Sequence, residues 1–257
     1  MNNITVVLEV YNEEHRLEKC LKSFDWADEL VVFVKKSTDN TLNIAQKYAT
    51  HVYEVDYCNG SENVINNFKL HQFKDWCFCI TASSLIDFEL VNEIIKLTSD
   101  KMFNYDVIGL PYQMHVFNLS GSFSPWNNQY KYPLIRKNVL ILSTELHNEI
   151  SWDSNNIYRI NTKTTQGRFK HFTHENPDVF FNKHIRYVKE EAIYYQKTFN
   201  RKALRKSFYR LVRAFAFVLI KRRTLFKGKD GFILSIAYLS YYIMLLTYVW
   251  YNNKHRN

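Results

Sequence analysis

Three short polar stretches each follow an apolar run in the N-terminal part of the chain. They are residues 11–14, 35–39 and 81–84. Lysine, hydroxyl and amide side chains are common in them, and backbone N–H groups at the starts of following helices also favour anions. We therefore expect these stretches to bind an anionic group such as a diphosphate, through Tyr11, Asn12, Glu13, Lys35, Lys36, Asp39, Thr81 and Ser83.

The elements that must position these stretches alternate between strand and helix. Short apolar or β-branched runs predict strands at 4–10, 30–34, 51–55 and 76–81. Helical periodicity predicts helices at 13–24, 41–48, 61–73 and 88–97. Repeated strand–helix units predict an α/β fold with a doubly wound, Rossmann-like, mostly parallel sheet. Ligands bind such a sheet beyond the carboxyl ends of its strands, which is where the three polar stretches lie.

The second half of the chain predicts further strands, a helix and a tail. Strand-like pieces that would add mixed or antiparallel strands lie at 107–111, 114–118, 130–136 and 157–162. Residues 177–198 show a helical pattern. The simplest organisation is one domain over residues 1–200, followed by a helical tail over residues 201–257.

The tail carries most of the positive charge of the chain. Residues 201–257 have a net charge of +12, whereas residues 1–200 have −3. Residues 201–223 interleave basic and apolar residues, as a helix on an anionic membrane would. Residues 231–251 contain no charged residue and are long enough either to cross a bilayer or to form a buried helix. We predict membrane association, with crossing or interfacial binding left open.

Nucleic acid is the other polyanion that the tail could attract. No nucleic-acid-binding motif accompanies the charge, so we predict no nucleic-acid partner. The chain begins Met1-Asn2-Asn3 and runs directly into a predicted strand, without the basic and apolar regions of a signal peptide. We therefore expect the protein at the cytoplasmic face of the cell membrane, peripheral or with a single C-terminal membrane helix.

The run from Ile4 to Glu14, the segment 27–33 and the Ser37–Thr41 stretch together resemble the opening of a family 2 glycosyltransferase. Within that family the similarity is greatest to bacterial enzymes that add sugars to lipopolysaccharide core and related surface glycans. It covers residues 1–100, with weaker echoes further along. The resemblance implies a GT-A fold for residues 1–200, a nucleotide-diphosphate sugar donor, inversion at the anomeric carbon, and a lipid-linked or polysaccharide acceptor.

The sequence departs from the pattern of this family at its acidic positions. Val34 stands where the family usually has an aspartate that holds the base, and Val10 replaces a threonine. The Asp-x-Asp motif that holds the donor's metal falls on Thr81-Ala82-Ser83. Hydroxyls are poor ligands for Mg²⁺ or Mn²⁺, so we predict no metal ligands, although the resemblance would admit such a cation.

Three explanations of the missing acids stay open. Catalysis could proceed without a metal, with another cation stabilising the leaving diphosphate; the candidates are Lys35, Lys36, Arg136, His171 and His174. A different donor could relax the base and metal sites together. Alternatively, the chain is a catalytically inactive relative that binds its ligand at the membrane.

Inverting transfer needs a carboxylate that takes the proton of the acceptor hydroxyl. The resemblance points to Glu149 as this base, with His147 beside it and Asp153 as the reserve; a surface or capping role for Glu149 is the alternative. His171 and His174 would lie on opposite faces of a strand, so we do not expect them to bind one metal together. Each either contacts phosphate or is an ordinary hydrogen-bonded histidine.

Overall fold

The computed structural model describes residues 3–57, 66–121, 123–127, 129–142, 150–163 and 165–255, with the backbone alone at 201. The chain divides into two compact units. We call Met1–Gln113 with Asn128–His171 the sheet unit, and Met114–Asn127 with Phe172–Asn257 the helical unit. The helix at residues 177–199 groups with the tail in the helical unit. The predicted domain boundary between residues 200 and 201 stays a prediction.

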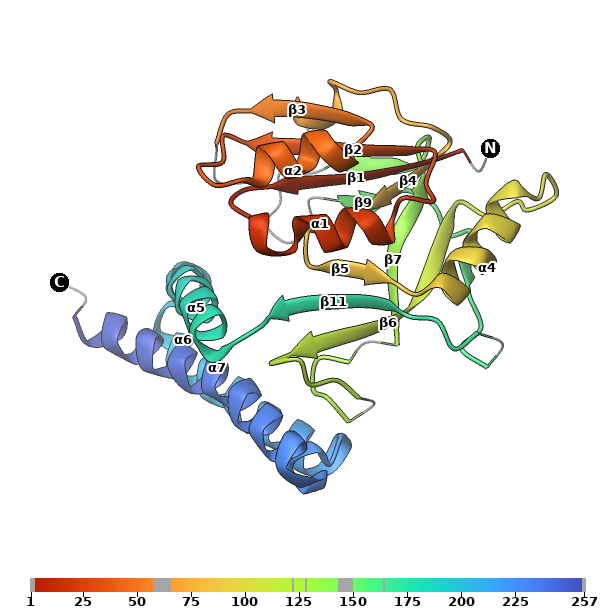
Figure 1. The fold of residues 1–257 in the computed structure, drawn as a ribbon. Coiled ribbons are helices and arrows are strands. Elements are labelled where there is room, and N and C mark those ends of the chain that lie inside the picture. Colours follow the sequence, from red (N-terminus) through yellow and green to blue (C-terminus); the bar gives the residue numbers. More distant parts are fainter. Residues whose placement is uncertain are drawn as a thin grey trace. The chain divides into compact units, whose positions relative to one another are not determined.

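The first half of the sheet unit is a parallel sheet. Its strands β1 (Ile4–Val10), β2 (Glu29–Lys35), β3 (His51–Val55) and β4 (Trp76–Cys79) lie in the order β3-β2-β1-β4 (Figure 1). β1 pairs in parallel with both β2 and β4. Nearly every residue of β1 and β2 is buried, because side chains cover both faces of a parallel sheet of this kind.

Helices cover one face of these strands. The helices α1 (Glu14–Ser23) and α2 (Thr41–Tyr48) lie side by side over β1 and β2 (Figure 1). The ring of Phe24, which follows α1, packs edge-on against Phe78 of β4 at 5.3 Å between centroids. On the other face Val7, Phe33 and neighbouring residues form a second buried cluster.

Antiparallel strands complete the sheet. The elements that follow β4 are β5 (Ser84–Ile86), α4 (Phe88–Ser99), β6 (Val107–Val116), β7 (Tyr130–Arg136), β8 (Leu140–Leu142), β9 (Ile150–Trp152), β10 (Ile157–Arg159) and β11 (Phe169–His174). β7 runs antiparallel to both β4 and β6, and β11 runs antiparallel to β5. Among the described residues the order is β3-β2-β1-β4-β7-β6-β11-β5, with β10 beside β6 and a separate β8-β9 pair. The two strand-like pieces expected at 107–118 are one strand, β6.

The predicted fold class is therefore confirmed. The chain has the mostly parallel α/β sheet, with added antiparallel strands, that a GT-A fold implies, and its C-terminal part is helical. Of the helix expected at 61–73, the structure describes residues 66 onward, and residues 66–68 are helical.

The helical unit is built from three long helices. They are α5 (Pro177–Phe199), α6 (Ala203–Ala216) and α7 (Gly228–Lys254). Between them lie the short 3₁₀ helices η1 (Asn200–Lys202) and η3 (Thr224–Phe226) and the short π-helix η2 (Phe217–Lys221). Asn176 caps α5 by accepting a hydrogen bond from the Val179 N–H. Glu191 of α5 binds both Arg210 of α6 and Tyr241 of α7, so one carboxylate joins the three helices.

Close packing in this unit relies on small residues. α6 buries Ala203, Ser207 and Ala214, whereas its Phe208 is 55% exposed. At the start of α7, a Cβ on Gly231 would lie 2.2 Å from the Thr224 carbonyl oxygen. The large apolar side chains that predicted an amphipathic helix are thus on the outer face of α6, and the small ones face its neighbours.

Candidate functional site

The carboxyl ends of β1 and β2 are joined by hydrogen bonds through Asn12. The Asn12 N–H donates to Ser37 Oγ at 3.1 Å, and Asn12 Oδ1 accepts from the Thr38 N–H at 2.9 Å. Asn12 has a left-handed backbone with φ of 51°, a conformation that asparagine tolerates better than most residues. The structure therefore brings the first two predicted stretches together.

Two predicted acidic residues at this edge hold the loops in place. The Glu13 N–H donates to Thr41 Oγ1 at 2.8 Å, and Glu13 Oε1 accepts from Arg16 at 2.7 Å. Asp39 accepts from the backbone N–H groups of Glu14 and Thr41. The pKa of Asp39 lies below its ordinary value; burial acts to raise it, but the hydrogen bonds from Thr41 and Glu14 outweigh burial. The Asp39 carboxylate thus positions the loops, whereas the Glu13 carboxylate pairs with Arg16 three residues later in the chain.

The predicted lysines at the end of β2 are paired with acids. Lys35 Nζ lies 2.5 Å from Glu9 Oε2, and Glu9 Oε1 accepts from Asn67 Nδ2 at 2.6 Å. Lys36, with φ of 34°, pairs with Asp56 on the surface. Sequence reasoning missed Glu9 as a site residue, although an acid inside an apolar strand was the available signal.

An exposed aromatic pair stands beside these loops. Tyr11 is 41% exposed and Tyr57 is 49% exposed, and their ring centroids are 4.5 Å apart. Aromatic faces that remain open to solvent can stack on a planar ligand. Tyr11 was predicted, and Tyr57 was not.

A cluster of hydroxyls occupies the position of the missing acidic motif. Thr81 Oγ1 lies 2.9 Å from Ser83 Oγ and 3.2 Å from Ser84 Oγ. Ser83 Oγ lies 3.5 Å from His171 Nε2, because β11 pairs with β5 so that His171 stands opposite Ser84. The predicted residues Thr81, Ser83 and His171 are therefore brought together.

The hydroxyl cluster borders a cavity of about 250 Å³. Besides Thr81, Ser84 and His171, the described lining includes Lys131 and Tyr132 of β7. Lys131 and Tyr132 were missed, since the pairing of β7 with β4 is not visible in the sequence. Ser84 belongs to the predicted stretch 81–84, although it was not among the residues chosen from it. The described lining contains no carboxylate, so it does not fit a hard divalent cation, which prefers carboxylate oxygens.

Arg136 lies beside the amino end of β4, away from the carboxyl ends of the parallel strands. β7 is antiparallel to β4, so Arg136 pairs with Trp76, the first residue of β4. Its guanidinium carbon lies 4.5 Å from the centroid of the Trp76 ring, and it donates to the carbonyls of Tyr105 and Phe103. The structure does not bring Arg136 together with Thr81.

His174 packs within the helical unit. It is 6% exposed, and its ring centroid lies 5.0 Å from that of Phe180 and 4.9 Å from that of His184. His147 and Glu149 lie outside the described residues. The reserve base Asp153 is exposed, and its N–H donates to the Val139 carbonyl at 2.9 Å.

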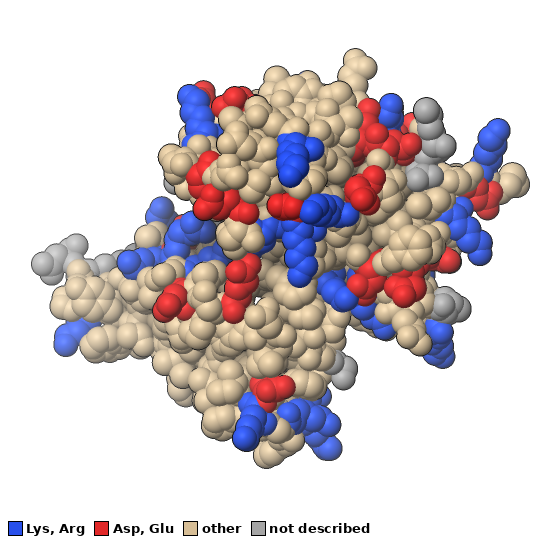
Figure 2. Space-filling model, viewed as in Figure 1, with Lys and Arg blue, Asp and Glu red and all other residues tan. Residues whose placement is uncertain are grey.

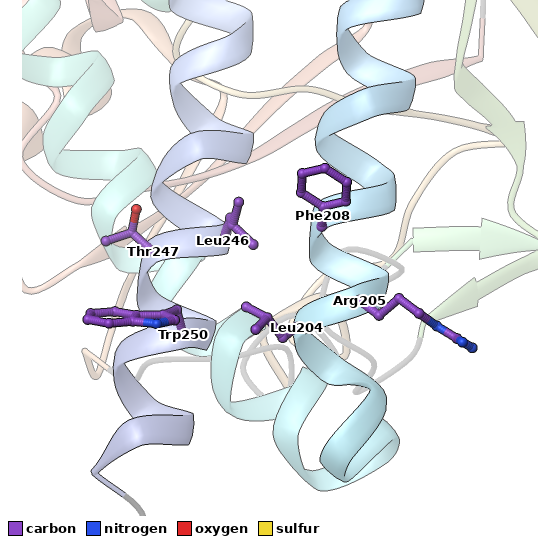
Figure 3. A pocket seen from close by; sticks show the side chains of 6 residues that line it. All are labelled: Leu204, Arg205, Phe208, Leu246, Thr247 and Trp250. Atoms are coloured by element: carbon purple, nitrogen blue, oxygen red, sulfur yellow. The ribbon is translucent and has the colours of Figure 1, made fainter.

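The helical unit carries an apolar groove between α6 and α7. A space of about 590 Å³ is lined by Leu204, Arg205, Phe208, Leu246, Thr247 and Trp250. Leu204 and Leu246 extend between the two helices, while Arg205 points away from them (Figure 3). Within the described part of the chain, α7 is the helix long and apolar enough to cross a membrane, with a mean hydropathy of 1.8 and 28% burial of its most apolar window.

The charged residues are distributed differently over the two units. On the face shown in Figure 2, acidic and basic side chains alternate over the sheet unit, whereas a broad uncharged area covers the middle of the helical unit. Large exposed apolar residues of that unit include Phe215, Phe226, Phe232, Ile236 and Trp250. Large exposed apolar patches are typical of surfaces that contact proteins or membranes.

No family model matches the chain, and no curated protein matches it. Among solved structures, S. aureus TarS 1–349 in complex with UDP-GlcNAc is 15% identical with a TM-score of 0.49, over 95% of this chain and 81% of that one. S. aureus TarS is 14% identical with a TM-score of 0.46, over 88% of this chain and 46% of that one, so the present chain spans about half its length. Glucosyl-3-phosphoglycerate synthase from Mycobacterium tuberculosis, in complex with Mn²⁺, UDP and phosphoglyceric acid, is 22% identical with a TM-score of 0.34, over 41% of this chain and 42% of that one. Likeness at this level does not establish an activity for this chain.

Proposed function

We propose that this protein is an inverting glycosyltransferase that moves a sugar from a nucleotide-diphosphate donor to a lipid-linked or cell-surface glycan acceptor. The observation that carries the proposal is the arrangement at the carboxyl edge of the parallel strands. There the loops after β1 and β2 are hydrogen-bonded to each other and lie beside an exposed tyrosine pair. The hydroxyls that follow β4 lie close to a histidine. A donor with a planar base and an anionic diphosphate suits that combination.

In this proposal each group has a separate task. Tyr11 and Tyr57 stack on the base. The hydroxyls of Thr81, Ser83 and Ser84 donate hydrogen bonds to the diphosphate, His171 donates a further one, and Lys131 of the cavity supplies positive charge. This arrangement does the work of a metal ion with protein groups alone, so we propose metal-independent transfer.

The transfer step then follows an in-line displacement. The acceptor hydroxyl oxygen attacks the anomeric carbon from the face opposite the diphosphate, the bond between that carbon and the diphosphate oxygen breaks, and the electron pair leaves with the nucleotide diphosphate. A carboxylate takes the hydroxyl proton. Glu149 is the residue we propose for it, on the resemblance of residues 145–149 to the family pattern.

We also propose that the helical unit binds the cytoplasmic face of a membrane and places the site near a lipid-linked acceptor. Its support is the exposed apolar surface of α6 and α7 together with the net charge of +12 over residues 201–257. α7 packs along α6, whose exposed positions include Arg205, Lys206 and Arg213. Carrying these charges into the hydrocarbon would be costly, so we favour a unit that lies in the interface.

A panel of nucleotide-diphosphate sugars tests the function directly. Purified protein is titrated with each donor by calorimetry, with Mn²⁺ and with a chelator, and donor hydrolysis and transfer to lipid-linked glycan acceptors are then measured. We expect one donor to bind and turn over equally well in both conditions. Binding without turnover for any acceptor would favour a non-catalytic binding protein, and turnover that requires Mn²⁺ would refute metal independence.

A further inference from the structure

A second group of side chains, two histidines and a glutamate, lies at the amino ends of the parallel strands. Glu29 is the first residue of β2, His51 is the first residue of β3, and His71 precedes β4. One ligand atom from each lies within 4.8 Å of the other two. These residues have no part in the proposed transfer, because the donor-binding loops follow the other ends of the same strands.

His71 is held so that one ring nitrogen faces Glu29. Its Nδ1 lies 3.1 Å from Tyr53 Oη, and its Nε2 lies 3.3 Å from Glu29 Oε2. The His71 side chain is 7% exposed and that of Glu29 is 14% exposed. When Nδ1–H donates to an outer partner, Nε2 keeps its lone pair for a metal, which is the usual outer-shell arrangement of a ligating histidine.

Glu29 is fixed by a chain of hydrogen bonds. The fully buried Thr5 accepts the Lys74 N–H at 2.9 Å and donates its hydroxyl to Glu29 Oε2 at 2.8 Å. Lys74 Nζ lies 3.2 Å from Oε1 of the same carboxylate. These contacts hold the carboxylate in a fixed orientation.

The distances suit a tetrahedral ion. Two ligands bound at 2.0–2.1 Å in a tetrahedral site are roughly 3.3–3.4 Å apart, and His71 Nε2 and Glu29 Oε2 are 3.3 Å apart. The ring of His51 lies 4.9 Å from that of His71 between centroids and is exposed, so it can turn toward the ion while leaving a position for water. Two imidazoles and one carboxylate form a set that Zn²⁺ accepts.

We propose that Glu29, His51 and His71 form a binding site for a divalent transition-metal ion such as Zn²⁺, separate from the donor site. The bound ion joins the first residues of β2 and β3 to the segment that leads into β4. The ion would stabilise the folded chain, because an ion that binds only the folded state shifts the unfolding equilibrium.

Zinc binding by the full-length, chelator-treated protein tests this site. Calorimetry with zinc chloride should show one equivalent bound, and saturating zinc should raise Tm by several degrees. His51→Gln should weaken the affinity at least tenfold, and because His51 is exposed this variant should fold normally. Glu29→Gln should also weaken the zinc affinity at least tenfold. His15→Gln, an exposed histidine of α1, serves as the matched control and should bind zinc like the parent.

Cobalt(II) gives a second readout that identifies the ligands. Binding at Glu29, His51 and His71 should give visible d–d bands without a thiolate charge-transfer band. A thiolate band would place the ion on cysteines and overturn the proposal. Unchanged affinity in His51→Gln, or no binding in the millimolar range, would overturn it equally. None of these measurements depends on whether the protein transfers a sugar.

Discussion

Among the described residues, large exposed apolar side chains are more common in the helical unit than in the sheet unit. Phe78 of β4 is fully buried between covered layers, whereas Phe208 of α6 is 55% exposed and Phe232 of α7 is 50% exposed. In the sheet unit polar groups gather where strands end; in the helical unit apolar groups face outward around a basic segment. The difference fits the two tasks that we propose: the sheet unit would provide a polar site for chemistry, and the helical unit would provide a surface for attachment. A substitution in one unit should therefore leave the task of the other unit unaffected.

The base variant Glu149→Gln should have the largest effect and should affect chemistry alone. Loss of a general base lowers kcat by about 10²–10⁴-fold, while donor affinity, circular dichroism and vesicle binding stay as in the parent. Steady-state turnover with the donor found in the panel measures it. Asp153→Asn is the matched control; if that variant loses turnover and Glu149→Gln keeps it, the base is Asp153.

The double variant Phe208→Ser/Val212→Ser should affect attachment alone. Both side chains are about half exposed on α6, and each large apolar group buried in a membrane contributes about 1.5–3 kcal/mol. Partition onto vesicles with anionic lipid should fall by about 10²-fold, with unchanged turnover on a soluble acceptor. Met102→Ser, at an 87% exposed position of the sheet unit, should partition like the parent. Equal loss in both variants would erase the contrast between the units.

Tyr11→Ala should weaken the donor without changing vesicle binding. Stacking of a base on an aromatic ring contributes about 1–3 kcal/mol, so the donor Kd should rise roughly tenfold or more in calorimetry. Tyr105→Ala is the control, since Tyr105 is 38% exposed and its carbonyl binds Arg136 at the opposite edge of the sheet. An unchanged Kd in Tyr11→Ala would mean that the base lies elsewhere.

His184 should give the helical unit a small pH dependence of stability. Burial lowers the pKa of His184 below its ordinary value of 6.5, and nearby Lys183 adds to this, although the hydrogen bond with the Phe180 carbonyl opposes it. The other titratable groups against its ring are His174, Tyr187 and Tyr241. The unfolded chain therefore binds a proton below pH 6.5 that the folded chain does not. The contribution of His184 to the free energy of unfolding should be complete above pH 6.5 and should decrease as the pH falls below it.

Urea unfolding at pH 8 and at pH 5.5 measures this effect. In His184→Gln the loss of unfolding free energy between the two values should be smaller than in the parent, whatever the absolute stability of the variant. An identical loss in both proteins would assign the pH dependence to other groups.

The sequence predicted the elements of the fold better than the contacts between distant segments. The strands at 4–10, 30–34 and 51–55 and the helix over 231–251 follow from apolar runs and periodicity, which are local properties. The antiparallel placement of β7 is not local, and it is what puts Arg136 beside Trp76 and away from Thr81. Likewise, the pattern of α6 predicted an apolar face but not that small residues would form its packed face.

Residues of the candidate site could be predicted where they follow a single strand in the sequence. Asn12, Asp39 and Thr81 could be named because each lies in a short polar stretch that follows an apolar run. Lys131 could not, because only pairing between strands brings it to the cavity. The group of Glu29, His51 and His71 has no motif spacing at all. Parallel register and the turn before β4 are what bring its three members together.

The bonds that Asn12 makes across to Ser37 and Thr38 bear on the thermodynamics of donor capture. Ordering a residue costs about 1–2 kcal/mol of conformational entropy, and in these loops that cost belongs to folding instead of association. Donor binding should then proceed without a slow closing step, and the amide protons of Glu14 and Thr38 should resist exchange with solvent before any nucleotide is present.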